Sequence, residues 1–404
     1  MQKLVVKGKK KLSGAIRISG SKNATLPILA ASILNKKKIE INKVPIVKDV
    51  ITMVELLKHI GSNIKFDLSK NKILIHNQNR KLKTTAPYKL LKTMRAGLIV
   101  LGPLLSKFKK AKVSLPGGCA IGSRPVDIHL FVLKKLGAKI KIKNGYIFAE
   151  TKKGLIGKRI RLPSISVGAT ENALIAASYA KGTTYLSNCA CEPEIKDLTI
   201  FLKKMGIKIQ WIGERKVKIS GSHNLKSVSH TVMFDRIEAG TFVIAGALTG
   251  KKLKISGIDT KILKKEISVL KKMNVKLRVN KNDITILNSK NIKPVSISTQ
   301  PYPGFPTDLQ AQIMVLMTRA NGISKIKENI FEKRFMHVPE LNRMGAKIKI
   351  SRDTSLVYGP QQLNGAEVMA TDLRASVSLV LAGLAAEDET IINRVYHLDR
   401  GYEK

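Results

Sequence analysis

The sequence is short of cysteine, of metal-ligand patterns and of long apolar runs, and each shortage excludes a class of protein. It contains three cysteines, Cys119, Cys189 and Cys191, which is too few and too odd a number for a disulfide framework. No CxxC or Cys/His pattern indicates a zinc site, and the seven histidines show no metal-ligand spacing. We therefore expect neither a metal nor a cofactor.

No segment has the length and apolarity that a membrane protein needs. The longest apolar stretches, near residues 97–106 and 377–386, fall well short of a membrane span. Residues 1–7 lack the apolar core of a secretory signal peptide. The sequence therefore predicts a cytoplasmic protein with no membrane partner.

Acidic residues are also scarce: 28 Asp and Glu stand against 73 Lys and Arg in 404 residues, a net charge of +45. Such a charge is typical of proteins that bind nucleic acid. The lysines, however, are spread along the chain among Ile and Asn, as in residues 107–112, 134–143 and 261–276, which indicates a biased composition at permissive surface positions. We expect no specific nucleic-acid partner, although the positive field attracts small anions.

What the chain does contain is an internal repeat with a period of about seventy residues. The pattern L-x-x-[L/M/I]-[G/N]-x-x-[I/L] predicts the end of an amphipathic helix, a Gly or Asn at its C-terminus and then a strand. It occurs five times, at Leu57–Ile64, Leu133–Ile140, Leu202–Ile209, Leu270–Leu277 and Leu341–Ile348.

A second element, an apolar helix followed by a polar turn and a strand, alternates with the first. Its six copies are Asn23–Asn42, Arg95–Leu115, Asn172–Asn188, Gly240–Gly257, Gln312–Asn329 and Ala375–Asn393. These helices are apolar on every face, which indicates that they are buried. The sequence therefore predicts an α+β fold of six similar units in compact domains, with the sixth unit incomplete because the first element has no sixth copy.

A glycine-rich segment, residues 116–125, surrounds Cys119 with three glycines and has a proline at each end. Such a segment forms neither helix nor strand, and it is typical of a mobile lid that carries an exposed thiol. The neighbouring Arg124 would lower the pKa of that thiol. The alternative is an incidental loop cysteine. Cys189 and Cys191 follow a strand, and we interpret both as structural.

Two short polar segments open buried helices. Residues 19–23 follow a strand and place Lys22 at a helix N-terminus, and residues 166–170 begin another helix. Backbone amides at a helix N-terminus, with or without a lysine, bind anions such as phosphate. The alternative for each segment is an ordinary helix cap.

Arginines are much rarer than lysines here, and five of them stand at element ends within distinctive phrases: Arg95, Arg124, Arg334, Arg374 and Arg400. The use of arginine where lysine is otherwise common indicates a need for the planar guanidinium group, which binds carboxylate or phosphate through two hydrogen bonds. The substrate would then carry both groups. A carboxylate, Asp308, ends a Pro- and Gly-rich loop just before a buried helix, where it either caps the helix or acts as a base.

Taken together, these phrases resemble a known family over essentially the whole chain, from Leu4 to Glu403. They include Ser21–Ala24, Tyr88–Ala96, Leu115–Gly122, Arg124–His129, Ser166–Thr170, Asp235–Glu238, Phe305–Gln310, Arg334–Leu341, Ala370–Ala375 and Tyr396–Tyr402. The sequence is similar to the UDP-N-acetylglucosamine 1-carboxyvinyltransferases, the enolpyruvyl transferases that catalyse the first committed step of peptidoglycan synthesis.

The resemblance implies a two-domain, inside-out α/β barrel, in which each domain is three βαβαββ units around buried helices. One domain would run over residues 22–232. The other would join residues 1–21 to residues 233–404 and be short at its C-terminus.

The resemblance also implies a reaction and its residues. The 3-hydroxyl of UDP-N-acetylglucosamine adds to the central carbon of phosphoenolpyruvate, and phosphate then leaves the tetrahedral intermediate. Catalysis would rest on Cys119 as the acid of the lid, Asp308 as the base, Lys22 and Arg400. Phosphoenolpyruvate would bind to Lys22, Asn23, Arg124, Arg334, Arg374 and Arg400. The UDP-sugar would contact Asn23, Arg95, Arg124, Pro125, Val126, Asp127, Ile128, Ser164, Ile165, Ser166, Val167, Gly168, Asp308 and Ile330.

Two positions depart from the family's pattern: Ser164 stands where a lysine often contacts the nucleotide, and Lys333 stands where asparagine is common. Three other interpretations compete with this one. A sister enzyme of the same fold uses shikimate 3-phosphate but would need neither the Gly-Gly-Cys lid nor the Arg-Pro-Val-Asp phrase. An RNA-end-processing enzyme of related fold would suit the charge, and a truncated, inactive remnant would suit the incomplete sixth unit.

Overall fold

The computed structural model describes residues 2–78, 80–117 and 126–403, which form two compact units. The N-proximal unit comprises residues 20–117 and 126–233, and the C-proximal unit comprises residues 2–19 and 234–403. Each unit has its own hydrophobic core.

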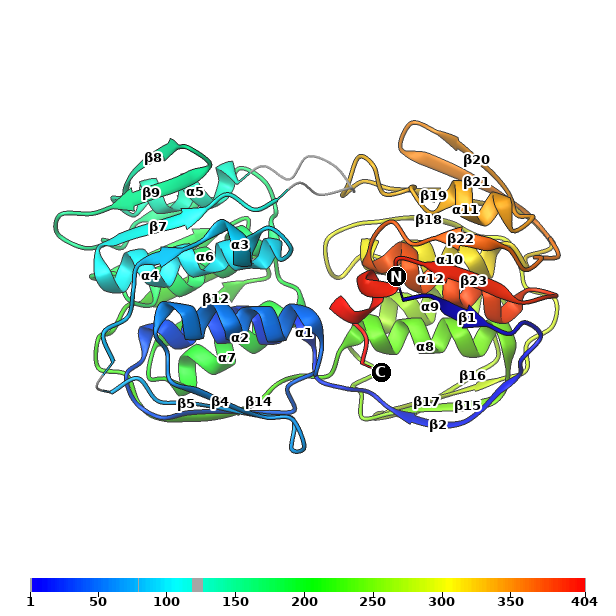
Figure 1. Cartoon of the computed structure of the whole chain (residues 1–404), viewed down its shortest axis with the longest axis horizontal. Coiled ribbons are helices and arrows are strands. Elements are labelled where there is room, and N and C mark those ends of the chain that lie inside the picture. The colour runs from blue at the N-terminus through cyan, green and yellow to red at the C-terminus, as the bar shows by residue number, and fades with distance from the viewer. Residues whose placement is uncertain (1, 79, 118–125, 404) are drawn as a thin grey trace. The chain divides into compact units, whose positions relative to one another are not determined.

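The N-proximal unit consists of short strands on the outside of apolar helices (Figure 1). Its helices are α1 (Lys22–Ala31), α2 (Lys48–Ile60), α3 (Tyr88–Leu91), α4 (Leu101–Phe108), α5 (Asp127–Lys135), α6 (Val167–Ala177) and α7 (Pro193–Lys204), with 3-10 turns η1 (Ser32–Leu34) and η2 (Arg95–Val100). Its strands are β3 (Ile39–Asn42), β4 (Ile64–Asp67), β5 (Lys72–Ile75), β6 (Thr85–Ala86), β7 (Lys110–Ser114), β8 (Lys139–Lys143), β9 (Tyr146–Glu150), β10 (Arg159–Arg161), β11 (Thr183–Ser187), β12 (Lys208–Gly213), β13 (Lys216–Ser220) and β14 (Val228–Thr231).

The C-proximal unit repeats this plan. Its helices are α8 (Arg236–Thr249), α9 (Lys264–Lys272), α10 (Gln310–Met317), α11 (Val338–Arg343) and α12 (Leu373–Ala385), with 3-10 turns η3 (Thr307–Leu309) and η4 (Val395–Arg400). Its strands are β1 (Leu4–Val6), β2 (Leu12–Arg17), β15 (Gly250–Ser256), β16 (Leu277–Val279), β17 (Asp283–Leu287), β18 (Ser296–Ser298), β19 (Gly322–Lys327), β20 (Lys347–Ser351), β21 (Thr354–Gly359), β22 (Glu367–Met369) and β23 (Thr390–Asn393).

Six small sheets carry the internal repeat. Five have four strands, in the orders β6-β7-β9-β8, β10-β11-β13-β12, β14-β3-β5-β4, β2-β15-β17-β16 and β18-β19-β21-β20. In each of these the first pair is parallel and the other pairs are antiparallel. The sixth sheet, β1-β23-β22, has three strands within the described residues. The predicted α+β class with six similar units is therefore confirmed.

The turn residues of the five-copy repeat behave as expected. The Gly or Asn of each copy has a positive φ, between 63° and 109°, and lies between a helix and the next strand: Gly61, Gly137, Gly206, Asn274 and Gly345. Gly has no Cβ to clash in this left-handed region, and Asn tolerates it. The helix–turn–strand pattern was therefore encoded locally, copy by copy.

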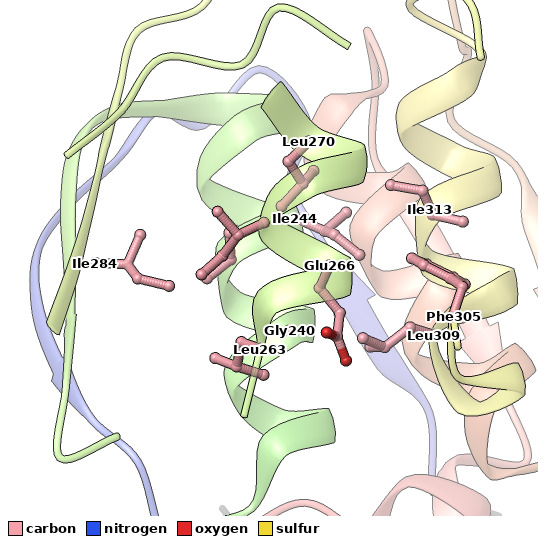
Figure 2. A pocket seen from close by; sticks show the side chains of 11 residues that line it. Gly240, Ile244, Leu263, Glu266, Leu270, Ile284, Phe305, Leu309 and Ile313 are labelled. Atoms are coloured by element: carbon pink, nitrogen blue, oxygen red, sulfur yellow. The ribbon is translucent and has the colours of Figure 1, made fainter. Parts of the chain in front are cut away.

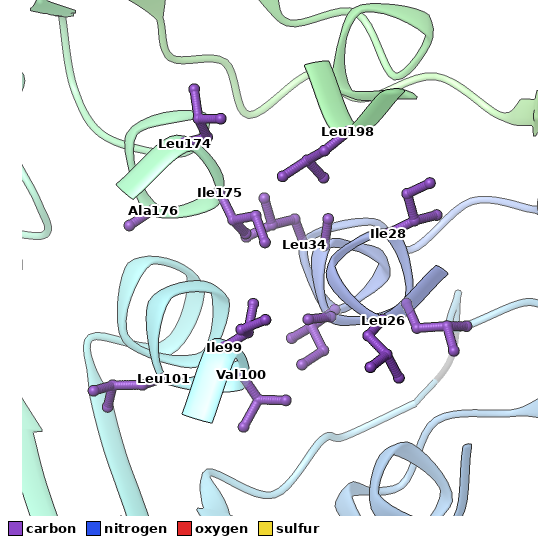
Figure 3. Close-up of a cluster of buried hydrophobic side chains, with 14 of the residues drawn as sticks. Leu26, Ile28, Leu34, Ile99, Val100, Leu101, Leu174, Ile175, Ala176 and Leu198 are labelled. Carbon is purple, nitrogen blue, oxygen red and sulfur yellow. The ribbon is translucent and has the colours of Figure 1, made fainter. Parts of the chain in front are cut away.

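The predicted buried helices form the two cores. In the N-proximal unit, apolar side chains of α1, η2, α4 and α6 converge, joined by Leu198 of α7 (Figure 3). In the C-proximal unit, α8, α10 and α12 contact one another pairwise. Close approach of α4 to α6 requires glycine at Gly102, where a Cβ would lie 2.2 Å from Asn172 Oδ1 and 2.9 Å from the Asn172 backbone oxygen. Tight packing of these buried helices fixes the positions of their N-termini within each unit.

Among the described residues, no helix combines the length and the apolarity that crossing a membrane requires.

Candidate functional site

The expected anion cradle of the N-proximal unit is the start of α1. Ser21 is the N-cap, and its hydroxyl accepts a hydrogen bond from the Ala24 amide at 3.3 Å. Lys22, in the first turn, is buried, and its Nζ donates to Asp49 Oδ2 of α2 at 3.2 Å. No acidic residue stands in the first turn of α1. The helix dipole and the lysine therefore place positive charge at one point, and Asp49 holds the lysine there.

A second group in this unit brings Arg95, at the start of η2, toward the start of α6. His129 of α5 links them. Asn172 Nδ2 of α6 lies 3.1 Å from His129 Nδ1, and a Cβ on Gly168 would lie 3.1 Å from the His129 ring. Burial lowers the pKa of His129 to about 4, and the positive charge of Arg95 acts in the same direction. The imidazole is therefore neutral at physiological pH, and because Asn172 donates to Nδ1, its proton is on Nε2.

The start of α6 is built like that of α1. Ser166 is the N-cap and accepts from the Ala169 amide at 3.3 Å, and the first turn carries no acid. Val167 and Gly168 are its first residues, while Ser164 and Ile165 lie in the loop before it, where Ser164 is exposed. Ser166 thus caps its helix, as the ordinary interpretation requires, and still leaves other amides of the first turn available to an anion.

Three expected site residues, Cys119, Arg124 and Pro125, lie outside the described residues. The neighbouring Val126 is the N-cap of α5, which begins with Asp127 and Ile128, and Asp127 is exposed. The two cysteines that we interpreted as structural are both buried. Burial raises the pKa of the Cys189 thiol to about 12 and also raises that of Cys191, so neither is a nucleophile at neutral pH.

In the C-proximal unit, Asp308 lies between two arginines. Its Oδ1 accepts from Arg334 Nη2 at 2.7 Å, and its Oδ2 accepts from Arg374 Nη2 at 3.0 Å. Both guanidinium groups are buried, whereas the Asp308 side chain is 25% exposed. Asp308 is thus held between two buried cations, and the charge of Asp235 also acts on Arg374.

Each arginine has support of its own. Arg334 Nη1 donates to the Thr307 hydroxyl at 3.0 Å, and that hydroxyl donates to Glu328 Oε2 at 2.9 Å. The other oxygen of Glu328 accepts the amides of Ile330 and Phe331 at 2.9 and 3.1 Å, which shapes the loop that carries Ile330. Rigid support of this kind keeps the arginine fork oriented.

Arg374 lies in the first turn of α12. Burial alone would lower the pKa of its guanidinium, but the charge of Asp308 and the Tyr402 hydroxyl outweigh burial and raise it. Arg374 Nη1 donates to Tyr402 Oη at 3.1 Å. Arg400 ends η4, where it is half-buried.

The alternative that Asp308 caps the next helix is wrong. The N-cap of α10 is Leu309, and neither η3 nor α10 has a side-chain cap. The carboxylate points instead to arginines 26 and 66 residues away in the chain. Charge-assisted bonds to two buried guanidinium groups outweigh a single cap bond.

Further side chains contact the expected site residues, among them Asp49 at Lys22, His129 at Gly168, Thr307 at Arg334 and Tyr402 at Arg374. His129 and Tyr402 stand inside phrases that carry the family resemblance, which was the available signal. For Asp49 the sequence offered no signal beyond the position of a carboxylate in the first turn of a helix.

A small cavity in the C-proximal unit is not a candidate site. It lies among α8, α9 and α10, is lined by apolar side chains with Glu266 at its edge, and holds about 10 Å³, which is room for one water at most (Figure 2). It is a gap in core packing.

Comparisons with known proteins agree on one family. A family model described as EPSP synthase (3-phosphoshikimate 1-carboxyvinyltransferase) matches residues 6–404. The chain is 60% identical over 403 residues to a UDP-N-acetylglucosamine 1-carboxyvinyltransferase of Pelagibacter ubique (strain HTCC1062), covering 100% of this chain and 96% of the relative. It is 51% identical over 404 residues to the protein of the same name from Rickettsia bellii (strain OSU 85-389), with the same coverage.

Solved structures show the same fold. The enolpyruvyl transferase NikO from Streptomyces tendae superposes with a TM-score of 0.90 at 25% identity, over 99% of this chain and 95% of that one. An EPSP synthase from Acinetobacter baumannii superposes with a TM-score of 0.75 at 18% identity, over 99% and 96%, which is a likeness of fold alone.

Proposed function

The chain belongs to the EPSP synthase family of carboxyvinyltransferases, and we propose how its residues divide the work of that chemistry. It transfers the enolpyruvyl group of phosphoenolpyruvate to the 3-hydroxyl of UDP-N-acetylglucosamine and releases phosphate, a step of peptidoglycan synthesis. The observation that carries this function is the identity of 47–60% with full-length relatives of that name. The likeness to EPSP synthase structures is 18% in sequence, so shikimate 3-phosphate is not favoured as the acceptor.

Two compact units fit the two domains of this family. We assign residues 22–232 to one domain and residues 1–21 with 233–404 to the other. Both substrates are charged, phosphate-bearing molecules that do not cross membranes unaided, which supports a cytoplasmic location.

The charged groups of phosphoenolpyruvate match the cations of the chain. Lys22, Arg124, Arg334, Arg374 and Arg400, with Asn23, hold its phosphate and carboxylate. The pairing of Lys22 with Asp49 and the support of Arg334 by Thr307 keep these cations in place before substrate arrives. Arg95, residues 124–128, residues 164–168, Asp308 and Ile330 contact the UDP-sugar.

The reaction needs one base and one acid. Asp308 accepts the proton of the sugar 3-hydroxyl as that oxygen bonds to the central carbon of phosphoenolpyruvate, and Cys119 delivers a proton to the methylene carbon. The carbon–oxygen bond to phosphate then breaks, the methyl group loses a proton, and the carbon–carbon double bond re-forms. Both Asp308 oxygens are engaged by arginines, so the substrate carboxylate competes for the same guanidinium groups. Its binding frees Asp308 for the hydroxyl proton.

Phosphate release from phosphoenolpyruvate, measured with and without UDP-N-acetylglucosamine, tests the proposal. We expect release that depends on the sugar nucleotide and is abolished in Cys119→Ala, while the matched variant Cys191→Ala stays close to wild type. Release with shikimate 3-phosphate in place of the sugar nucleotide would contradict the acceptor. Full activity of Cys119→Ala would contradict the lid acid.

A further inference from the structure

Arg374 has a second anchor besides Asp308. Its Nη2 donates to Asp308 Oδ2, and its Nη1 donates to the hydroxyl of Tyr402, 28 residues farther along the chain. A buried guanidinium group destabilises the folded protein for each N–H donor that is left without an acceptor. Tyr402 therefore decides where one arm of the fork points.

Tyr402 in turn contacts Thr241 of α8, with 3.0 Å between the two hydroxyl oxygens. The direction of this bond follows from chemistry. Arginine can only donate, so Tyr402 Oη accepts from Arg374 and has its own proton to give to Thr241 Oγ1. Burial raises the pKa of the Tyr402 phenol, so the proton stays on it at physiological pH. Thr241 gives its own proton to the Ile237 carbonyl at 2.8 Å.

Gln312 of α10 closes the circuit. Its Nε2 donates to Thr241 Oγ1 at 3.2 Å and to the backbone oxygen of Asp308 at 2.9 Å. The chain of bonds thus runs from the Asp308 carboxylate through Arg374, Tyr402, Thr241 and Gln312 back to the Asp308 backbone. Three buried helices, α8, α10 and α12, each contribute one member, and the donors and acceptors along the chain of bonds are mutually consistent.

We propose that Tyr402 and Thr241 are positioning residues, which fix the Arg374 fork and the Asp308 carboxylate in the geometry that receives the carboxylate of phosphoenolpyruvate. This inference rests on the proposed roles of Arg374 and Asp308. Tyr402 and Thr241 would act through Arg374 and Asp308. The rival role is structural: Tyr402 would only anchor the segment after η4 to the unit.

Tyr402→Phe separates the two roles because it deletes the hydroxyl and keeps the ring. We expect KM for phosphoenolpyruvate to rise by about tenfold to a hundredfold, the range for losing a hydrogen bond to a charged group. KM for UDP-N-acetylglucosamine should stay within about twofold, and kcat should fall less than KM rises, because the lost interaction also holds the ground state. The matched control is Tyr396→Phe, an exposed tyrosine in η4.

Thr241 supplies a second, independent variant. Thr241→Val removes the acceptor for the Tyr402 proton, and we expect a smaller rise in the same KM, whereas Thr241→Ser keeps the hydroxyl and restores wild-type behaviour. In the double variant Tyr402→Phe/Thr241→Val, KM for phosphoenolpyruvate should rise by less than the product of the two single-variant rises, because both residues act through the same chain of hydrogen bonds.

The outcomes are distinguishable. If wild type releases phosphate and Tyr402→Phe changes the melting temperature without changing either KM, the role is structural and the inference is overturned. Equal rises of both KM values would overturn it as well. If wild type itself releases no phosphate with either substrate pair, the proposed function fails, and the circuit is only an element of packing.

Discussion

The buried helices of the two units begin in different ways. In the N-proximal unit, α1 and α6 start at the hydroxyl caps Ser21 and Ser166, with no acid in either first turn. In the C-proximal unit, α8 and α12 start at the carboxylate caps Asp235 and Asp372. Each carboxylate accepts two backbone amides, at 2.9 and 3.0 Å for Asp235 and at 2.7 and 3.1 Å for Asp372.

This difference determines how each unit attracts an anion. A neutral cap satisfies one amide and leaves the positive end of the helix dipole uncompensated, so an external anion gains from it. A carboxylate cap carries a negative charge of its own, which already compensates the positive end of the helix dipole. At α8 and α12 an external anion therefore depends on side-chain cations. The C-proximal unit has two buried arginines around one aspartate, whereas the N-proximal unit pairs Lys22 with a single aspartate.

The largest expected effect is at Asp308, a carboxylate that caps no helix and binds two buried arginines. Asp308→Asn should lower kcat by about a hundredfold to ten-thousandfold, the range for removal of a general base, and leave the melting temperature within a few degrees. Steady-state phosphate release and thermal unfolding measure the two quantities. Asp353→Asn, which removes a carboxylate from an exposed ion pair of the same unit, is the control. A variant that melts early but keeps its rate would show Asp308 to be structural.

The next largest effect is expected at Lys22, the cation in the first turn of α1. Lys22→Ala should lower kcat/KM for phosphoenolpyruvate by about a hundredfold or more, because a cation aimed at a phosphate is removed. Arg400→Ala should have a comparable effect.

Dispersed lysines provide the control for this prediction. Lys139, Lys141 and Lys276 are exposed, and replacing each with Ala should leave turnover nearly unchanged. Equal losses for Lys22 and for these three would show that overall charge, not position, attracts the substrate. Moderate salt should then slow capture strongly, since charges farther apart than about 8 Å are screened at physiological ionic strength.

A third prediction uses the acid in the first turn of α8, Glu238, which accepts from the Ser19 amide at 3.2 Å and from the Ser19 hydroxyl. Burial raises the pKa of Glu238 from 4.5 to about 7, and the hydrogen bonds from Ser19 oppose that shift. Between pH 4.5 and 7 the folded chain holds a proton that the unfolded chain has released, so stability falls as pH rises through this window.

Glu238→Gln removes this titration. We expect the wild-type free energy of unfolding to fall by about 1–3 kcal/mol more than that of the variant between pH 5 and pH 8. Denaturant unfolding at three pH values measures it, with the exposed Glu389 as the matched control site in Glu389→Gln. Parallel pH dependence in wild type and Glu238→Gln would contradict the assignment.

The smallest effect tests the comparison most directly. Ser166→Asp gives α6 a carboxylate cap of the kind that α12 has. Asp caps a helix as well as Ser, so stability should change by less than about 0.5 kcal/mol. KM for UDP-N-acetylglucosamine should rise about two- to fivefold, because the new charge compensates the helix end. KM for phosphoenolpyruvate should not change. An unaltered KM for the sugar nucleotide would remove the start of α6 from the site.

Residues that contact the site divide into those that a local pattern could find and those that it could not. Lys22, Ser166, Asp308 and Arg374 stand at element ends, where the sequence singles them out by position, whereas the expectation for Arg334 was wrong, because it lies within the turn between β19 and α11. The partners Asp49 and Thr241 carry no such mark. Lys22 and Asp49 are 27 residues apart, and Thr241 and Tyr402 are 161 residues apart. Only tertiary packing makes them neighbours: α1 against α2 in the first pair, and the segment after η4 against α8 in the second.

The sequence by itself determined the repeat, the buried helices, the turn residues with positive φ and the helix caps, because each depends on interactions within a few residues of the chain. The tertiary structure decided which charges pair, that Asp308 binds two arginines instead of capping α10, and that one hydroxyl orients Arg374. These choices depend on which helix ends the fold brings together, and no local periodicity carries that information.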